Sequence, residues 1–414
     1  MDSRLKHMKY IKDVSIVALV TFILLALADR LLGMLGFPDE VPIQVSHPSN
    51  FAEERSNYEF KYAFKTNSMG LRYREIPLEK NNSEYRVLLL GDSFVEGAGV
   101  ESAETFGAQL EKQLQSHNNA NRQIQFINGG LSGRGPLEYW RLFINVGLKY
   151  NPDTVLIGLM GNDVENMPEN LDRQQLYASH QISQRSGLRS LLHAIFPHFY
   201  IIVSRATLAY YTRHEDSFPA LDRIRNHARR LRIPEDAIYQ WESSLPKEIK
   251  DNADHINEGR VAFGLLRPNF LANNLDIDSP KAKLQFESMI LALDEIVKVA
   301  QNKKLRVGII YIPFDYQYDP RKFSESDPWI ATGMHVNREW LYNISNLQQL
   351  LSKWATDRMI DFHDLTPVFR KAISANPQTR LSFRIDGHWT SSGHSLAAKS
   401  LESWLIERDL IAVK

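Results

Sequence analysis

The sequence predicts an α/β fold built on a doubly wound parallel sheet. Three short apolar runs have the length and composition of fully buried strands, and each passes directly into a polar loop that contains glycine. Segments with helical spacing of apolar residues separate the runs, and strands that alternate with helices form parallel sheets. Right-handed crossovers then place all three loops along one edge of the sheet. The runs lie at 87–90, 124–127 and 154–159.

The remaining elements of the sheet domain follow from the same patterns. Apolar residues at helical spacing come after each of the first two strands, where a helix would cover a face of the sheet. Later in the chain a helix, two further strands and a C-terminal helix complete the alternation. The predicted helices lie at 105–115, 137–146, 286–302 and after Thr390, and the further strands at 305–312 and 359–362.

Between residues 165 and 285 this alternation is lost. The segment is too long for a loop between sheet elements, so we predict a mostly helical insertion that could act as a lid. Residues 38–84 are polar and irregular but too aromatic for a free linker, which indicates an extended segment packed on the core. The predicted parts are 1–37, 38–84, the core formed by 85–164 with 286–414, and the insertion 165–285.

The N-terminus has the character of a membrane segment. Four basic residues precede an uncharged apolar run over 14–28, and apolar sequence resumes after Asp29-Arg30 and continues to Phe37. We predict a cytoplasmic stub and an uncleaved signal-anchor helix over 1–37, which places the rest of the chain in a periplasmic or extracellular space. A signal peptide cleaved after the small-x-small group Ala26-Leu27-Ala28 is the main alternative, and a cytosolic amphipathic helix is the other.

Composition excludes several classes of function. The 49 basic and 49 acidic residues give a formal charge of zero, which argues against nucleic acid as a partner. The chain has no cysteine, which excludes a thiol nucleophile, disulfides and thiolate metal sites. Neither a metal nor an organic cofactor is indicated by the pattern of the remaining residues.

The polar loops at the strand ends carry a set of residues suited to acyl transfer. Serine catalysis needs an alcohol, a base, a carboxylate that orients the base, and donors for the developing oxyanion. Ser93 follows the first strand and supplies the alcohol. His388 and Asp386 supply the base and its orienting carboxylate from one short loop. The backbone amides of Ser93 and Gly133 and the side chain of Asn162 would form the oxyanion hole, because glycine allows close backbone approach.

Four blocks of this sequence, in order, resemble those of the SGNH (GDSL-type) hydrolases. They cover most of residues 85–400, with the insertion unmatched. The resemblance implies a flavodoxin-like three-layer fold, a serine esterase activity without cofactor, and an acyl-ester substrate. It also carries the oxyanion roles onto Gly133 and Asn162. The blocks are Gly91-Asp92-Ser93, Asn128-Gly129-Gly130-Leu131-Ser132-Gly133, Gly161-Asn162-Asp163 and Asp386-Gly387-His388.

The last block departs from many members of that family. Only Gly387 separates Asp386 from His388, and Trp389 follows. This spacing is similar to that of the branch with polysaccharide O-acetylesterases and O-acetyltransferases, which implies O-acetyl glycan esters and leaves hydrolysis or transfer open. Gly97, Gly99 and the segment 67–72 resemble the membrane-anchored bacterial branch of the family. His394 stays as an alternative base, otherwise expected on the surface. Asp92 is expected to support its loop, and Trp389 to line the pocket.

Two other classes of function use similar residues. Metallophosphoesterases also place Gly-Asp and Gly-Asn-Asp loops at strand ends, but Ser93 and Val164 stand where further metal ligands would follow. A non-catalytic module that binds cell-envelope glycan would keep the fold. The intact set of Ser93, Asp386 and His388 argues against that alternative, because a degenerate site tolerates the replacement of any one of them.

Overall fold

The computed structural model describes residues 2–36, 45–116, 122–179, 188–203, 206, 218–323 and 336–411. Contacts divide the chain into two units, which are described separately. One consists of residues 1–43 and 181–219, and the other of residues 44–180 and 220–414.

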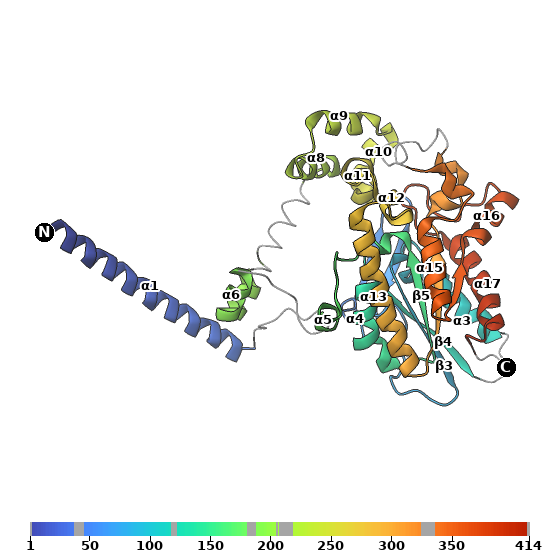
Figure 1. Ribbon diagram of the computed structural model, residues 1–414, viewed down its shortest axis with the longest axis horizontal. Coiled ribbons are helices and arrows are strands. Elements are labelled where there is room, and N and C mark those ends of the chain that lie inside the picture. Colours follow the sequence, from blue (N-terminus) through green and yellow to red (C-terminus); the bar gives the residue numbers. More distant parts are fainter. Residues whose placement is uncertain are drawn as a thin grey trace. The chain divides into compact units, whose positions relative to one another are not determined.

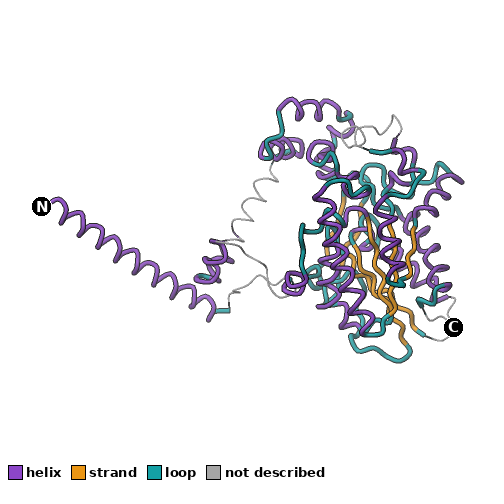
Figure 2. Tube along the Cα trace, viewed as in Figure 1, coloured by secondary structure: helices purple, strands orange, loops and turns teal. Residues whose placement is uncertain are grey.

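The larger unit is built on a five-stranded parallel sheet (Figures 1 and 2). Its strand order is β4-β3-β5-β6-β7, and every neighbouring pair is parallel. Counted along the chain, the order of these core strands is 2-1-3-4-5, which is the flavodoxin-like arrangement. The predicted α/β fold is therefore confirmed. The strands are β3 (Glu84–Gly91), β4 (Gln123–Gly130), β5 (Thr154–Met160), β6 (Arg306–Ile312) and β7 (Asp361–Asp364).

Helices cover both faces of this sheet and bury its side chains. Successive residues of a strand point to opposite faces, so Val87 and Leu89 of β3 belong to one apolar cluster and Leu88 and Leu90 to the other. The first cluster includes residues of α3, α16 and α17, and the second includes residues of α4, α13 and α15. These helices span α3 (Phe106–Ser116), α4 (Pro136–Asn145), α13 (Pro280–Asn302), α15 (Asn346–Asp357), α16 (Thr366–Ala375) and α17 (Ser391–Glu407).

Two predicted boundaries differ from the structure. Helix α13 begins at Pro280 and not at 286, because the Ser279 side chain accepts a hydrogen bond from the Ala282 amide at 3.0 Å and proline occupies the first turn. Strand β7 begins at Asp361 and not at 359. Met359 has a positive φ of 55° and is 96% exposed, so it belongs to the turn after α15.

The described part of the insertion is helical, as the sequence predicts. Helix α11 (Glu258–Leu266) lines the candidate site, together with residues just before and just after it. The segment expected to be extended contains an antiparallel hairpin, β1 (Ala52–Ser56) with β2 (Lys61–Lys65). Among the described residues of the larger unit, the other α-helices are α2 (Ser93–Glu96), α5 (Arg173–Ala178), α8 (Ala220–Arg230), α9 (Glu235–Ser244), α10 (Lys247–Asp251) and α12 (Phe270–Leu275).

The smaller unit contains the N-terminal helix α1 (Asp2–Met34) and α6 (Leu188–Ile195). Within α1, residues 12–34 are long and apolar enough to cross a membrane, a property that signal sequences share. Asp29 interrupts the apolar face but is buried, and its carboxylate accepts a hydrogen bond from the Phe199 amide at 2.8 Å. The rings of Phe22 and Phe196 pack edge to face at 5.3 Å.

Candidate active site

Ser93 is the first residue of the short helix α2, directly beyond the carboxyl end of β3. Asp92 caps this helix, because its carboxylate accepts a hydrogen bond from the Phe94 amide at 2.9 Å. The abrupt change from strand to helix turns the Ser93 hydroxyl toward the edge of the sheet. Ser93 is 8% exposed, so its hydroxyl lies at the base of a cleft and not on an open surface.

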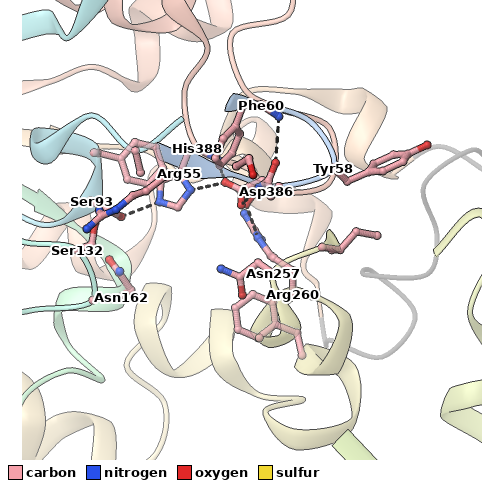
Figure 3. A pocket seen from close by; sticks show the side chains of 18 of the residues that line it. Arg55, Tyr58, Phe60, Ser93, Ser132, Asn162, Asn257, Arg260, Asp386 and His388 are labelled. Carbon is pink, nitrogen blue, oxygen red and sulfur yellow. Dashed lines mark hydrogen bonds and ion pairs between the residues drawn. The ribbon is translucent and has the colours of Figure 1, made fainter. Parts of the chain in front are cut away.

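The structure brings the predicted base and carboxylate to this hydroxyl (Figure 3). The Nε2 atom of His388 lies 2.7 Å from Ser93 Oγ. Its Nδ1 atom shares a short hydrogen bond with Asp386, which fixes the imidazole orientation. Gly387, the one intervening residue, adopts a left-handed φ of 84°, a conformation that glycine accepts without strain.

Electrostatics divide the roles of this pair. Burial by itself raises the pKa of a carboxyl group, but the charge and hydrogen bond of His388 outweigh it and lower the pKa of Asp386 to about 2. Burial also lowers the pKa of an imidazole, and here the charge and hydrogen bond of Asp386 outweigh it, so the pKa of His388 is raised. Asp386 therefore stays ionised, and His388 is the group that exchanges a proton near neutral pH.

Asn57, in the turn between β1 and β2, is a further partner of Asp386. Its Nδ2 donates to Asp386 Oδ2 at 3.1 Å, while the imidazole occupies Oδ1. The Asn57 amide is itself held in place, since its Oδ1 accepts hydrogen bonds from the backbone amides of Glu59 at 2.8 Å and Phe60 at 3.0 Å. The hairpin thus extends the Ser93–His388–Asp386 chain by one residue.

The candidate oxyanion donors lie on the same edge. Gly133 has a positive φ of 69° and lines the cleft with Asn162 and Ser93. Among the residues that the structure describes, the backbone N–H groups of Ser93 and Gly133 donate to no protein acceptor. One N–H of the Asn162 amide donates to Asp92 Oδ2 at 3.2 Å, which leaves the second for a substrate oxygen. Gly133 is required here for its left-handed backbone and not for lack of space, because a Cβ there would meet nothing within 4 Å.

Glu96 holds the Gly133 loop against α2. Its carboxylate is fully buried and accepts hydrogen bonds from the backbone and the hydroxyl of Ser132, the residue before Gly133. His47 at 2.7 Å and Arg55 at 3.2 Å supply the other donors from the segment upstream of the sheet. These contacts outweigh the effect of burial and lower the pKa of Glu96. Glu96 is therefore an ionised anchor for the candidate oxyanion hole.

Two residues lie elsewhere than predicted. Trp389 does not line the cleft but is fully buried beneath it, edge to face with Phe94 at 5.3 Å and stacked on Phe369 at 4.9 Å. It can support the site only through packing. His394 is not on the surface: it is 1% exposed, and its Nδ1 accepts a hydrogen bond from the Phe106 amide at 3.3 Å. Burial lowers the pKa of His394 to about 3. Its role is structural, and it is no longer an alternative base.

The acidic residues of the first and third blocks serve the fold. Asp92 accepts from Phe94 and Asn162, and Asp163 accepts from the Tyr139 hydroxyl at 2.6 Å and the Met160 amide at 2.8 Å. Both carboxylates are fully buried, and burial raises the pKa of each. All four carboxylate oxygens are thus used inside the protein. A metallophosphoesterase would need such oxygens as metal ligands.

The cleft in front of Ser93 has a volume of about 1100 Å³. Three parts of the chain form its walls: the β1–β2 hairpin, the sheet edge, and the insertion around α11. The described walls are rich in aromatic side chains and also carry three arginines. The aromatic residues are Tyr58, Phe60, Tyr62, Phe94, Phe263, Phe270 and Phe314, and the arginines are Arg55, Arg260 and Arg267.

The sequence did not identify Asn57, Glu96 or Arg260 as parts of the site. One feature of the sequence could have indicated Glu96. It is the single charged residue among the small and apolar residues that directly follow Ser93. Asn57 and Arg260 contact Asp386 from 329 and 126 residues away along the chain. No local pattern could have indicated these two contacts.

Comparisons with known proteins find only distant structural similarity. No known protein family and no curated protein matches the sequence. Solved structures do match, among them an acetyl xylan esterase, with 13% identity over 77% of this chain and 99% of that one and a TM-score of 0.37. An acetylxylan esterase from Geobacillus stearothermophilus has 13% identity over 78% and 93%, with a TM-score of 0.35. A GDSL-like lipase from Bacteroides thetaiotaomicron has 11% identity over 80% and 93%, also with a TM-score of 0.35. Similarity at this level does not identify the reaction of this chain.

Proposed function

We propose that this chain is a serine-dependent ester hydrolase of the SGNH type. The observation that carries the proposal is the hydrogen-bonded chain from Ser93 Oγ through His388 to Asp386, 2.7 Å long at its first step. Unused backbone donors of Ser93 and Gly133 lie beside that hydroxyl in an open cleft. Alcohol, base, orienting carboxylate and oxyanion donors are the complete set that acyl transfer by serine requires.

The reaction follows from this geometry. His388 Nε2 takes the proton of Ser93 Oγ as the oxygen attacks the ester carbonyl carbon, and the carbonyl electron pair moves onto the oxygen. The amides of Ser93 and Gly133 and the free N–H of Asn162 bind that oxyanion. His388 then donates its proton to the departing alcohol, which leaves an acyl group on Ser93. Water, deprotonated by His388, attacks this acyl group and releases the acid and the free serine.

The substrate class we propose is an O-acyl ester, with O-acetyl esters of cell-envelope or exported glycans first. A cleft of about 1100 Å³ far exceeds the volume of an acetyl group and leaves room for the alcohol side of a large ester. Exposed Tyr58 and half-buried Phe60 offer aromatic surface in its wall, which suits a sugar ring. An acyltransferase would use the same residues and replace water by a sugar hydroxyl.

We further propose that helix α1 anchors the protein in a membrane, with the catalytic unit periplasmic or extracellular. The apolar stretch over 12–34 supports this proposal. Basic residues precede the stretch, which favours a cytoplasmic N-terminus. Secretion after cleavage of this helix is the alternative, and mass spectrometry of the mature N-terminus would distinguish the two.

The test of the proposed activity is turnover of p-nitrophenyl acetate by the purified full chain in detergent, with and without a chelator, together with labelling by a fluorophosphonate probe. We expect chelator-insensitive turnover and covalent labelling. Addition of an oligosaccharide with free hydroxyls as acceptor separates hydrolysis from transfer. A transferase moves the acetyl group of p-nitrophenyl acetate onto the sugar, whereas a hydrolase releases free acetate. An absence of both turnover and labelling would favour a glycan-binding module.

The pH dependence of the reaction follows from the raised pKa of His388. The base must be neutral to accept the proton of Ser93, so kcat/KM falls as pH decreases through that pKa. We expect an acid limb of unit slope with its midpoint above the ordinary histidine value of 6.5. Asp386 adds no second ionisation above about pH 2. A midpoint well below 6.5, measured in kcat/KM profiles, would contradict this electrostatic arrangement.

Replacement of Glu96 by glutamine is expected to weaken oxyanion binding without unfolding the protein. The amide keeps the size of the carboxylate but turns one acceptor into a donor, facing groups that are themselves donors. Loss of a single oxyanion donor costs roughly 10²–10³-fold in kcat, and displacement of the Gly133 loop should cost about 10- to 100-fold. Ser132→Ala removes only the hydroxyl contact with Glu96, so its kcat should fall less than that of Glu96→Gln. Wild-type kcat in Glu96→Gln, at unchanged circular dichroism, would show that Glu96 is not needed for this loop.

A further inference from the structure

The loop that carries Asp386 and His388 is held by charged side chains from outside the sheet. The Glu59 carboxylate, in the hairpin, accepts hydrogen bonds from the backbone amides of residues 384, 385 and 386, at 2.8, 2.9 and 2.7 Å. Lys322, after β6, donates to the backbone carbonyl of Arg384 at 2.7 Å and pairs with Asp315 at 2.7 Å. The backbone groups around the turn are therefore fixed by partners that are distant in sequence.

Arg260, in α11 of the insertion, completes this set. Its Nε donates to the backbone carbonyl of Asp386, as Figure 3 shows. Its guanidinium also lies directly against Gly387, because a Cβ added at that glycine would overlap Nη2. Arg260 therefore occupies the space beside the one residue that separates Asp386 from His388. Glycine at 387 is needed for this approach as well as for its positive φ.

The charge of Arg260 differs from that of the other two arginines in the cleft. Arg55 pairs with Glu53 and Glu96, and Arg267 pairs with Glu165 at 2.7 Å. For Arg260 the described residues provide a backbone carbonyl and the ring of Phe263 at 5.5 Å, but no carboxylate within ion-pair distance. Its positive charge thus acts on the catalytic pair without a neutralising partner of its own.

We propose that Arg260 is a positioning residue for the catalytic loop, through which the insertion fixes the geometry and the electrostatic environment of His388. This inference rests on the proposed esterase function. The charged groups around His388 act in opposite directions. Arg260 disfavours the imidazolium, whereas Asp386 and Asp92 favour it. Other charged groups also contact this loop. Glu59 accepts from its backbone amides, Asp315 lies beside Gly387 and pairs with Lys322, and Arg384 pairs with Glu248. His394 remains unprotonated in the core.

The test compares Arg260→Met, Arg260→Lys and the matched control Arg267→Met in the full chain. Methionine preserves an unbranched apolar stem but removes the charge and the hydrogen bond. We expect Arg260→Met to move the acid limb of kcat/KM to higher pH by roughly 0.5–1 unit, because a positive charge near the imidazolium is lost. The plateau should fall about tenfold or more as the loop loses its geometry. Arg260→Lys should keep the limb near its wild-type midpoint, and Arg267→Met should not move it.

The outcomes separate this inference from the proposed activity. A lower plateau with an unmoved acid limb in Arg260→Met would assign Arg260 a merely structural role and overturn the proposal. Unchanged kinetics in that variant would also overturn it. If the wild-type chain shows no turnover, the esterase assignment fails instead. In that case, NMR titration of the His388 ring with ¹³C-labelled histidine still tests the role of Arg260. The proposal requires the pKa of His388 to be higher in Arg260→Met than in the wild type.

Discussion

Ser93→Ala is expected to abolish both ester turnover and fluorophosphonate labelling. The substitution removes only the hydroxyl oxygen, which lies 2.7 Å from His388 Nε2 and is the single nucleophile in that hydrogen-bonded chain. Loss of a nucleophile that acts together with its base costs on the order of 10⁴-fold or more in kcat. The residue is small and 8% exposed, so the fold should not change. We expect circular dichroism and thermal unfolding close to those of the wild type.

Ser132→Ala is the matched control for this experiment. Ser132 lines the same cleft, but its hydroxyl donates to Glu96 and has no basic partner. This variant should keep its labelling. Labelling that persists in Ser93→Ala would place the nucleophile elsewhere. Equal background rates for the wild type and Ser93→Ala would remove the catalytic assignment altogether.

Asp386→Asn should have the second largest effect, a loss of roughly 10⁴-fold in kcat at neutral pH. Asparagine fits the same space, and its oxygen or amide can still meet Asn57. It cannot provide the negative charge that raises the pKa of His388 and stabilises the imidazolium. It also no longer fixes the tautomer with a proton on Nδ1. Steady-state rates over a pH series would show the loss together with an acid limb moved to lower pH.

Asp92→Asn provides the comparison for this variant. Asp92 is equally buried and close to the site, but its oxygens accept from the Phe94 amide and from Asn162 and do not bond to the base. We expect a loss at least tenfold smaller than in Asp386→Asn. Similar losses in the two variants would mean that Asp386 acts only as a structural support of its loop.

The core of the fold could be predicted because its signals are local. A fully buried parallel strand is a short run of apolar residues, and the strand predicted at 87–90 lies within the observed β3. Glycine-containing turns at the ends of such strands mark the edge where ligands bind. For the same reason, the sequence alone was enough to place Ser93, Gly133 and Asn162 together. The Asp386-Gly387-His388 group was found through its own short spacing.

The features that the sequence did not predict depend on contacts between segments that are distant in the chain. His394 lies at a helix start that is usually exposed, yet α17 packs on α3 and buries the ring against Phe106. Trp389 was expected in the pocket because it adjoins His388, but neighbouring residues in extended backbone point in opposite directions. Asn57 and Glu59 look like ordinary turn residues until the hairpin packs against the loop at 384–386.

The hydrogen bonds of Asn57, Glu59 and His47 have a consequence for where the proposed catalytic unit begins. The first core strand starts at Glu84, and a sheet with its flanking helices could fold from there. Such a fragment would retain Ser93, Asp386 and His388 but lose the groups that hold the loop and Glu96 in place. The groups that hold the proposed active site therefore begin at His47, well upstream of Glu84, where the first strand of the sheet begins. Residues 47–65, which precede the sheet in the chain, are thus part of the proposed active site and more than a connection to the sheet.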